Sequence, residues 1–360
     1  MAYTTIDDPT IYFNTVLYTG NASTQSITGV GFSPSFVWIK SRNDTNEHYL
    51  FDIIRGVHEP LIASANTAET TDTNTVTSFD SDGFSIGNNT GINGSSDTEC
   101  SWNWKAGTSF TNDASATGVG TIDSTGSVSS DSGFSIISYS GTGSVGTVAH
   151  GLNAVPKMIL FKNRTTASNW LVYHEGIGNT HNLYLDANNA KGDRSDTFND
   201  TSPTSSVFTV GTADLNTSGN SIIAYCFAEK KGFSKIGTHV GNGNADGTFV
   251  FCGFRPAFVI SKRYNGSGNW TVHDNKRNSY NGQYNTLFPN LYNVEISSSA
   301  RSMDFFSNGF KFAGTDEGNV SGEEYIHIVF ASSPFTNSSG VPNNARWLWN
   351  MYYYFMYVAF

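Results

Sequence analysis

The sequence contains little charge. Only 14% of its 360 residues are Asp, Glu, Lys or Arg, the formal net charge is −10, and no block of lysines or arginines occurs. A protein without a basic patch has no electrostatic footprint for duplex nucleic acid or for an anionic membrane surface. We therefore expect neither nucleic acid nor a membrane among its partners.

Cysteine is also scarce. The three cysteines, Cys100, Cys226 and Cys252, lie at unrelated spacings, which argues against a disulfide framework and against a CxxC metal site. We expect these cysteines to be small residues of the core. The amino-terminal run AYTTIDDPT has neither a basic nor an apolar region, so no secretory signal is expected. No cofactor and no metal site is expected.

Glycine, small polar residues and aromatics are abundant instead. The chain has 36 glycines and 14% aromatic residues, a mixture that suits many short strands joined by tight turns. Long helices should be rare.

One pattern occurs three times. The copies read GFSPSFVWIKSR from Gly31, GLNAVPKMILFKNR from Gly151 and GFRPAFVISKRY from Gly253. In each, a lysine follows the proline by six residues, and a segment that begins with His48, Trp170 or Trp270 starts eight residues later. A period of roughly 100 residues is the size of a small domain and predicts three tandem copies of one module, an arrangement more typical of structural or binding proteins than of enzymes.

Each copy predicts six to eight short strands, so we expect an all-β protein of three tandem antiparallel β-sandwich modules of the jelly-roll or lectin-like kind. The expected boundaries are 1–107 for module one, 132–231 for module two and 232–336 for module three. Residues 108–131, rich in Gly, Ser, Thr and Asp, predict a flexible or loosely packed linker. Residues 337–360 form a tail outside the repeats.

That tail ends in WLWNMYYYFMYVAF, 14 residues without charge, of which eight are aromatic. It is shorter than the roughly 20 apolar residues that a membrane helix needs. Such a segment is expected to be buried, either against its own module or in another subunit. The residues expected to serve assembly are Trp347, Trp349, Tyr352, Tyr353, Tyr354 and Phe355.

Signals for catalysis or ion binding are weak. Residues 141–146 match GxGxxG, but a strand pattern follows where a dinucleotide site needs a helix, so a hairpin turn is the better interpretation. The histidines form no HExxH or HxH pair, and no GxSxG elbow occurs. The turns at Asp80–Gly83 and Asn244–Gly247 could supply oxygen ligands to Ca²⁺, but glycine turns need no metal. No catalytic residue is assigned, and the protein is not expected to be an enzyme.

The best candidates for ligand binding lie in repeats two and three, in and just before the segment that starts eight residues after the repeat lysine. Trp170 and Trp270 each follow an asparagine in a loop with serine or glycine, and an aromatic face beside an amide is the usual way to hold a sugar. The candidate ligand-binding residues are Trp170, Asn169, Trp270, Asn269, His174 and Asp274. The alternative is that these aromatics anchor the core.

The runs GLNAVPKMILFKNRTTASNWLVYHEGIGNT, GNWTVHDNKRNSYN and FFSNGFKFAGTD resemble the repeat region of large virion proteins of tailed phages, many of which infect marine bacteria and cyanobacteria. The resemblance covers about residues 10–346 and brings no catalytic residues. It implies a virion surface protein, a tail-fibre or spike component assembled in the host cytoplasm that attaches to a host-surface glycan. Its expected partners are other virion proteins and copies of itself, with a trimer as the candidate homo-oligomer. The alternatives are a capsid decoration or filament subunit without receptor binding and, from a different class, a carbohydrate-active enzyme.

Overall fold

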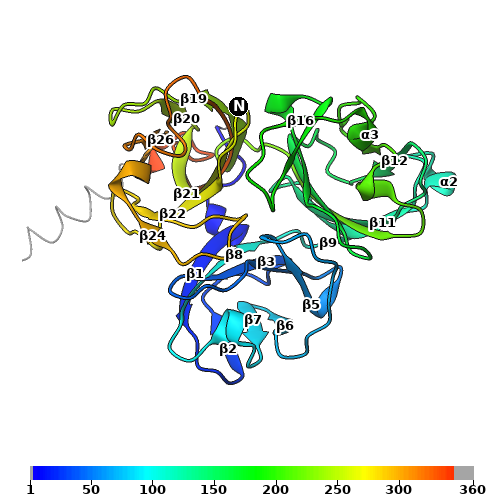
Figure 1. Ribbon diagram of the computed structural model, residues 1–360, viewed down its shortest axis with the longest axis horizontal. Coiled ribbons are helices and arrows are strands. Elements are labelled where there is room, and N and C mark those ends of the chain that lie inside the picture. Colours follow the sequence, from blue (N-terminus) through cyan, green and yellow to red (C-terminus); the bar gives the residue numbers. More distant parts are fainter. Residues whose placement is uncertain (1–2, 344–360) are drawn as a thin grey trace, which may run out of the picture.

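The computed structural model describes residues 3–343 and shows three lobes around a common centre (Figure 1). Each lobe is built from one of the sequence repeats. The described helices are short, since α1 (Thr90–Asn93), α2 (Ala114–Thr117) and α3 (Ser195–Phe198) have four residues each. The 3-10 turns are η1 (Pro9–Ile11), η2 (Glu175–Ile177), η3 (Asp214–Asn216) and η4 (Ser299–Arg301). The expected all-β class is confirmed.

Module one has two antiparallel sheets. The larger has the order β1 (Phe13–Thr19), β8 (Thr98–Trp104), β3 (Phe36–Ser41), β4 (Tyr49–Asp52), β5 (Gly56–Ile62). The smaller has the order β2 (Gln25–Thr28), β7 (Gly83–Ile86), β6 (Val76–Asp80).

Module two has an eight-stranded antiparallel sheet and a strand pair. The sheet order is β16 (Gly192–Asp193), β15 (His181–Tyr184), β14 (Leu171–His174), β13 (Met158–Asn163), β18 (Ser221–Phe227), β11 (Phe134–Ser140), β10 (Ser124–Ser129), β9 (Thr108–Asn112). The pair is β12 (Gly146–Ala149) with β17 (Val207–Val210).

Module three repeats the plan. Its larger sheet has the order β19 (Ser234–Val240), β27 (Glu324–Pro334), β21 (Phe254–Arg263), β22 (Trp270–Asp274). Its smaller sheet has the order β20 (Phe249–Phe251), β26 (Gly309–Phe312), β25 (Met303–Phe306), and β23 (Asn285–Thr286) pairs with β24 (Ile296–Ser297).

The strand register is the same in all three modules. Phe36 pairs with Trp104, Met158 with Phe227, and Phe258 with Phe330, each four residues before the repeat lysine. On the other side of that strand the same three residues pair with Asp52, His174 and Asp274. These registers fix which positions are structurally equivalent, so the modules can be compared residue by residue.

Residues 108–131 correct an expectation, because they are not a loose linker. They form β9 and β10, which extend the sheet of module two beyond β11, with Thr125 opposite both Thr111 and Ser138. The turn between these strands contains α2, whose amino terminus is capped by the Asp113 carboxylate accepting from the Ala116 N–H. Strand pairing here satisfies the backbone polar groups that a flexible linker would leave to water.

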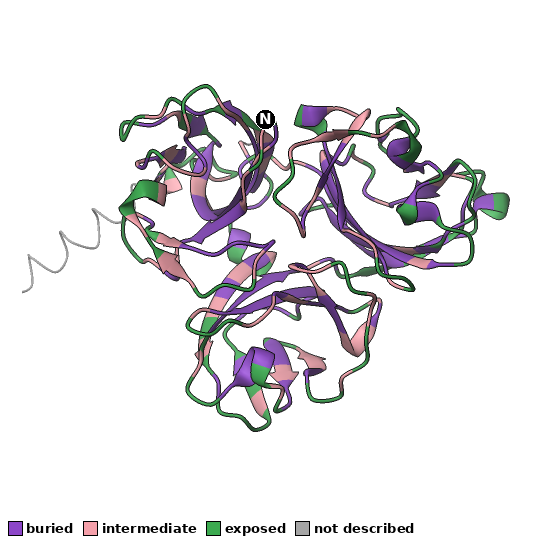
Figure 2. Ribbon diagram, viewed as in Figure 1, coloured by how far each residue is buried: buried purple, intermediate pink, exposed green. Residues whose placement is uncertain are grey.

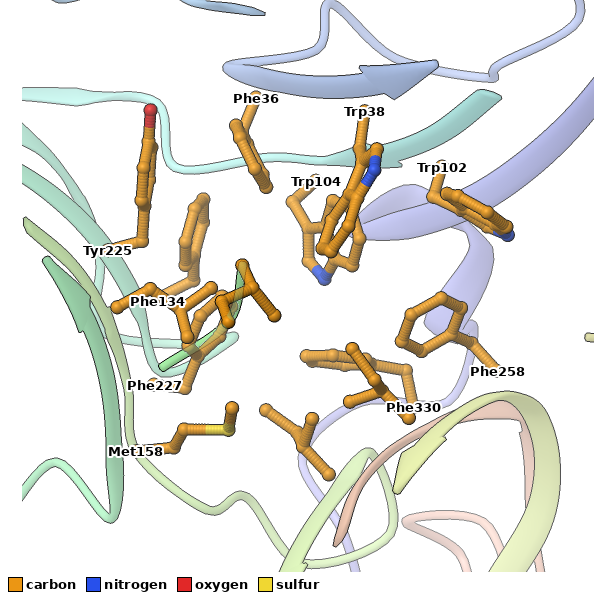
Figure 3. Packing of buried hydrophobic residues seen from close by; sticks show 14 of the residues in the cluster. Phe36, Trp38, Trp102, Trp104, Phe134, Met158, Tyr225, Phe227, Phe258 and Phe330 are labelled. Carbon is orange, nitrogen blue, oxygen red and sulfur yellow. The ribbon is translucent and has the colours of Figure 1, made fainter. Parts of the chain in front are cut away.

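In each large sheet the strand that carries the repeat lysine is buried on both faces, which explains the uninterrupted apolar runs before the lysines. One face packs on the module's own small sheet and makes a separate core in each lobe. The other face points to the molecular centre, where residues of all three modules join one cluster (Figures 2 and 3). Cys100, Cys226 and Cys252 are free and buried, as expected.

The amino-terminal segment ties module three to module one. The Tyr3 hydroxyl donates to the Gly253 carbonyl at 2.7 Å before the chain enters β1. The Asp7 carboxylate accepts from the Ser338 N–H and hydroxyl, both at 2.6 Å. The two ends of the described chain therefore meet on module three. No described helix is long and apolar enough to cross a membrane.

Candidate functional site

The two tryptophans proposed for sugar stacking are buried between modules. Trp170 and Trp270 have no exposed surface. The Trp170 Nε1–H donates to the Ile62 carbonyl of module one, and the Trp270 Nε1–H donates to the Tyr184 carbonyl of module two, both at 2.8 Å. A ring enclosed on both faces cannot stack on a sugar in this conformation. This corrects the ligand-binding expectation and places both residues in module interfaces.

Three of the other four candidates also contact residues within the protein. Asn169 and Asn269 are half-buried, and Asn269 donates to the Glu317 carboxylate at 3.0 Å. His174 and Asp274 are buried at equivalent positions of modules two and three. Trp170 lies between modules one and two, Trp270 and His174 lie between modules two and three, and Asp274 lies between modules three and one. The six candidates therefore form no common site.

A buried ion network joins module three to module one. Asp274 Oδ2 accepts from the Arg277 Nε–H at 2.5 Å and from the Trp102 indole of module one at 3.1 Å. Glu295 accepts from Arg277 and, across the interface, from Arg42, both at 2.8 Å. Although burial raises the pKa of Asp274, the neighbouring guanidinium and its hydrogen bonds outweigh that effect and keep the pKa below its usual value. These charges are paired, and those of Asp274 and Arg277 are fully buried, which indicates a structural role.

The interface of module one with module two repeats this network. Asp52 accepts from Arg55 at 2.5 Å and from the Tyr225 hydroxyl of module two at 2.7 Å. Glu69 bridges Arg55 and Arg164, at 2.9 and 2.6 Å. Because Tyr225 is the register equivalent of Trp102, the same position reaches the same carboxylate in both interfaces.

The third interface, between modules two and three, uses histidine in place of aspartate. His174 Nε2 faces the His327 carbonyl at 3.4 Å, and the His327 and His239 rings meet at 3.3 Å. Burial lowers the pKa of His174 and of His239 to about 4 each, and it lowers the pKa of His327 well below its usual value. These imidazoles are therefore neutral at pH 7.

Two of the three repeat lysines donate across a module interface, whereas Lys40 donates to the Ser41 and Asp44 carbonyls of its own module. Lys162 and Lys262 are buried, and their ammonium groups donate to the Asn66 and Asn188 carbonyls of the preceding module at 3.2 and 3.4 Å. Burial lowers the pKa of Lys162 to about 8 and that of Lys262 to about 7. Two of the three lysines at this recurring position thus hold neighbouring modules to one another.

The apolar centre offers no room for a ligand. The cavity among the side chains drawn in Figure 3 has a volume of about 20 Å³. This is about the space that one water molecule needs. Phe36, Trp104, Phe227 and Phe330 lie on its wall. The centre is a packed core shared by three modules.

A polar groove on module two is open to a ligand. It has a volume of about 360 Å³ and lies where the β9–β10 hairpin extends the large sheet. Its lining consists of hydroxyl, amide and carboxylate side chains with one buried tyrosine: Thr111, Asn112, Asp113, Asp123, Ser124, Thr125, Ser138, Tyr139, Ser140 and Ser221. We call these residues the hydroxyl groove.

The strand register builds the floor of the hydroxyl groove. Thr111, Thr125 and Ser138 lie side by side across β9, β10 and β11, and Ser140 pairs with Ser221 on β18. Along β11 this face continues inward as Ile136, which belongs to the central cluster. The same sheet face is thus apolar at the molecular centre and hydroxyl-lined at its outer end.

The chemistry of the hydroxyl groove is that of hydrogen bonding. Asp113 has its pKa lowered by hydrogen bonds from the Ser115 hydroxyl and the Ala116 N–H, so it is an acceptor at neutral pH. Asp123 accepts from the Ala114 N–H through Oδ1. Tyr139 contributes no open ring face, because it is buried and its hydroxyl donates to the Leu215 carbonyl. Such a lining suits a polyhydroxyl ligand held edge-on by hydrogen bonds.

The sequence did contain a signal for this groove. Thr125, Ser127 and Ser129 alternate with Gly126 and Val128 in STGSVS (124–129), a period of two that indicates a strand. The abundance of Gly, Ser and Thr obscured that period and suggested a linker.

The remaining candidates are structural or lie outside the described residues. The Asp82 carboxylate accepts from the Gly29 and Gly31 N–H groups, and Asp246 pairs with Lys311 at 2.7 Å. Within residues 3–343 no three His, Cys, Asp or Glu side chains gather as metal ligands would. The assembly residues Trp347, Trp349, Tyr352, Tyr353, Tyr354 and Phe355 lie beyond the described range.

Comparison with known proteins gives one family. Residues 8–334 match the family model described as Domain of unknown function (DUF7483), and the chain belongs to this family. No curated protein and no solved structure matches it.

Proposed function

We propose that this member of the DUF7483 family is a non-catalytic virion surface protein, a tail-fibre or spike component, and that its hydroxyl groove takes a host-surface glycan. The observation that carries the binding part is the groove itself, about 360 Å³ in volume and lined by hydroxyls and two exposed carboxylates. The virion part rests on the sequence resemblance to tailed-phage proteins.

The lining favours a sugar over an apolar ligand. Serine and threonine hydroxyls can both donate to and accept from sugar hydroxyls, and Asp113 and Asp123 add strong acceptors. A groove without an aromatic platform binds each sugar weakly, so attachment would depend on many copies acting together.

The scaffold favours display of such a groove. The floor lies on strands of an eight-stranded sheet whose inner part is locked into the shared core. Sites on paired strands keep their geometry better than sites on loops. We extend the proposal to the finer fold class: each lobe is a sandwich of the jelly-roll or lectin-like kind, since a core separates its large sheet from its small one.

The test is glycan binding by groove variants. We expect the double variant Asp123→Asn with Thr125→Val to lose about tenfold or more of its affinity for host polysaccharide, because the first change replaces a charged acceptor with a neutral amide and the second removes a hydroxyl, both at exposed positions. Thr28→Val is the matched control, as an exposed strand threonine of module one. Equal adsorption of all three proteins to host cells would contradict the proposal, and turnover of the polysaccharide would favour an enzyme.

The second candidate is a capsid decoration or filament subunit without receptor binding. Labelled-antibody electron microscopy of purified particles separates the two. Label at the tail tip or fibres supports attachment, whereas label over the head or along a filament supports decoration.

A further inference from the structure

Module three exposes three phenylalanines on its small sheet. Phe249 and Phe251 on β20 and Phe306 on β25 are 44%, 60% and 37% exposed. They share the outward face, because Phe251 and Phe306 both lie opposite Gly309 and Phe249 lies opposite Lys311. The Phe249 and Phe306 rings are in edge contact at 5.9 Å. We call these three residues the aromatic face; it lies in the lobe labelled β20 and β26 in Figure 1.

The equivalent positions in the other modules are not aromatic. By register, Ser26, Thr28 and Asp80 of module one correspond to Phe249, Phe251 and Phe306. In module two, Thr147 and Ala149 correspond to the first two positions. The same sheet thus folds with small or polar residues outside, so the fold itself does not require the phenylalanines. Three exposed phenylalanines on one face indicate an interaction surface.

The described chain ends beside this face. The Phe335 N–H donates to the Gly253 carbonyl, two residues beyond the end of β20, and the Asn343 N–H donates to the Phe335 carbonyl. The N–H of Gly253 in turn donates to the carbonyl of Asn308, in the turn that follows Phe306. Ser338 is fixed by the Asp7 carboxylate. The exit of the chain is therefore held at the edge of the aromatic face.

The segment that follows has matching chemistry. Residues 344–360 carry one charged side chain, Arg346, and the last 14 residues include eight aromatics. Seventeen residues reach up to roughly 55 Å when extended, far more than one short sheet spans. A tethered segment also has a high effective concentration at a site next to its attachment point, which favours it over a second copy of the chain.

We propose that residues 344–360 dock on the aromatic face of module three of the same chain. Gly309 lets β20 and the Phe249 ring pack closely against β26, because a side chain there would begin 2.1 Å from the Val250 carbonyl oxygen and 3.0 Å from the Phe249 ring. Aromatic side chains of the segment would pack on the exposed surfaces of the three phenylalanine rings and leave water, while Lys311 and Asp246 form a polar rim. The aromatic face is then an intramolecular site, distinct from the hydroxyl groove of module two.

The first experiment maps the contact in the full chain. A photo-crosslinking amino acid replaces Phe251, and its equivalent control replaces Thr28 of module one. We expect light to join residue 251 to peptides within 344–360 in protein of monomer mass, with no such product from position 28. Crosslinked dimers, or crosslinks from position 251 only to other segments, would overturn the proposal.

The second experiment removes the face. The triple variant Phe249→Ser, Phe251→Thr, Phe306→Asp installs the residues that module one carries at these positions. We expect chymotrypsin to cleave within 344–360 about tenfold faster than in the unmodified protein, because cleavage follows the undocked population. Tyr280→Ser, which removes an 84% exposed tyrosine of the same module, is the control. Unchanged cleavage in the triple variant, with its melting temperature preserved, would refute docking on this face.

Discussion

Several residues that recur in the repeats lie in the interfaces between modules. Trp170 and Trp270 donate across module boundaries, and Lys162 and Lys262 reach carbonyls of the preceding module. The constant spacing indicated that these positions have the same role in each repeat. It could not show whether that role is contact with a ligand or contact with the neighbouring module. Both roles require a fixed side chain at the end of a strand.

Trp170→Ala should therefore act on stability. We expect the free energy of unfolding to fall by about 3–5 kcal/mol, because a fully buried indole is lost and the Ile62 carbonyl loses its donor. Denaturant unfolding measures the change. Tyr280→Ala, at an 84% exposed position, should stay within about 0.5 kcal/mol. A Trp170→Ala protein of normal stability that no longer binds glycan would show that this interpretation is wrong.

Tyr225→Phe tests a single bond between modules one and two. The change removes the hydroxyl that donates to the buried Asp52 carboxylate at 2.7 Å, and hydrogen bonds to charged groups contribute about 1.5–3 kcal/mol. We expect faster amide exchange at residues 50–55 of module one. Tyr139→Phe is the control, because that buried hydroxyl donates to the Leu215 carbonyl within module two. Equal exchange at residues 50–55 in both variants would argue against a special role for the interface bond.

At the scale of elements, the positions of strands were easier to predict from the sequence than the pairing between strands. The apolar runs before Lys40, Lys162 and Lys262 are the strands β3, β13 and β21, as their patterns indicate. The β9–β10 hairpin was missed because Ser, Thr and Gly are common to linkers and to polar strand faces, and only pairing with β11 distinguishes the two. The hydroxyl groove was missed with it.

Gly126→Ala should detach this hairpin. A side chain at position 126 would begin 2.0 Å from the Ile136 carbonyl oxygen on β11, so β10 would have to move away. We expect a cost of about 1–3 kcal/mol and faster amide exchange in residues 108–129. Gly192→Ala in β16 is the control, because the nearest atom there is 3.9 Å away. If exchange in the hairpin stays slow, the close packing of β10 on β11 is not required.

At the scale of the whole molecule, the modules form a closed ring, which their sequence did not foretell. Equivalent backbone bonds close all three junctions: Glu69 to Arg164, Lys191 to Tyr264, and Glu295 to Arg42, at 3.0, 2.8 and 2.7 Å. Tandem repeats can extend as a line or close on themselves, and the choice depends on the angle between neighbours. That angle is set by packing of the central cluster and has no local signature.

Acid should open the ring between modules two and three. Burial lowers the pKa of His174 to about 4, below the value of about 6.5 in an unfolded chain, so the neutral imidazole stabilises the fold. This stabilisation is complete above pH 6.5 and is lost as the pH falls toward 4, at up to about 3 kcal/mol for one such histidine. Protonation is further opposed by Lys157 near His174 and by Lys235 near His327.

The measurement is amide exchange at pH 7.5 and pH 4.5. We expect the gain in exchange at acid pH to be largest in β14 and β27, and His174→Gln, which keeps a donor for the His327 carbonyl, to reduce it. The ion network around Asp274 should resist the same acidification, because its carboxylate pKa lies below the usual value. Uniform acid loosening of all three interfaces would contradict this prediction.

Closure of the ring within one chain also has an evolutionary consequence. Three identical subunits around an axis must repeat every substitution three times, whereas three covalently linked copies can each change alone. Position 251 is a phenylalanine while its counterparts are Thr28 and Ala149, and the β9–β10 extension is attached to module two. The ring of three modules therefore need not be threefold symmetric. The aromatic face and the hydroxyl groove each occur once per molecule.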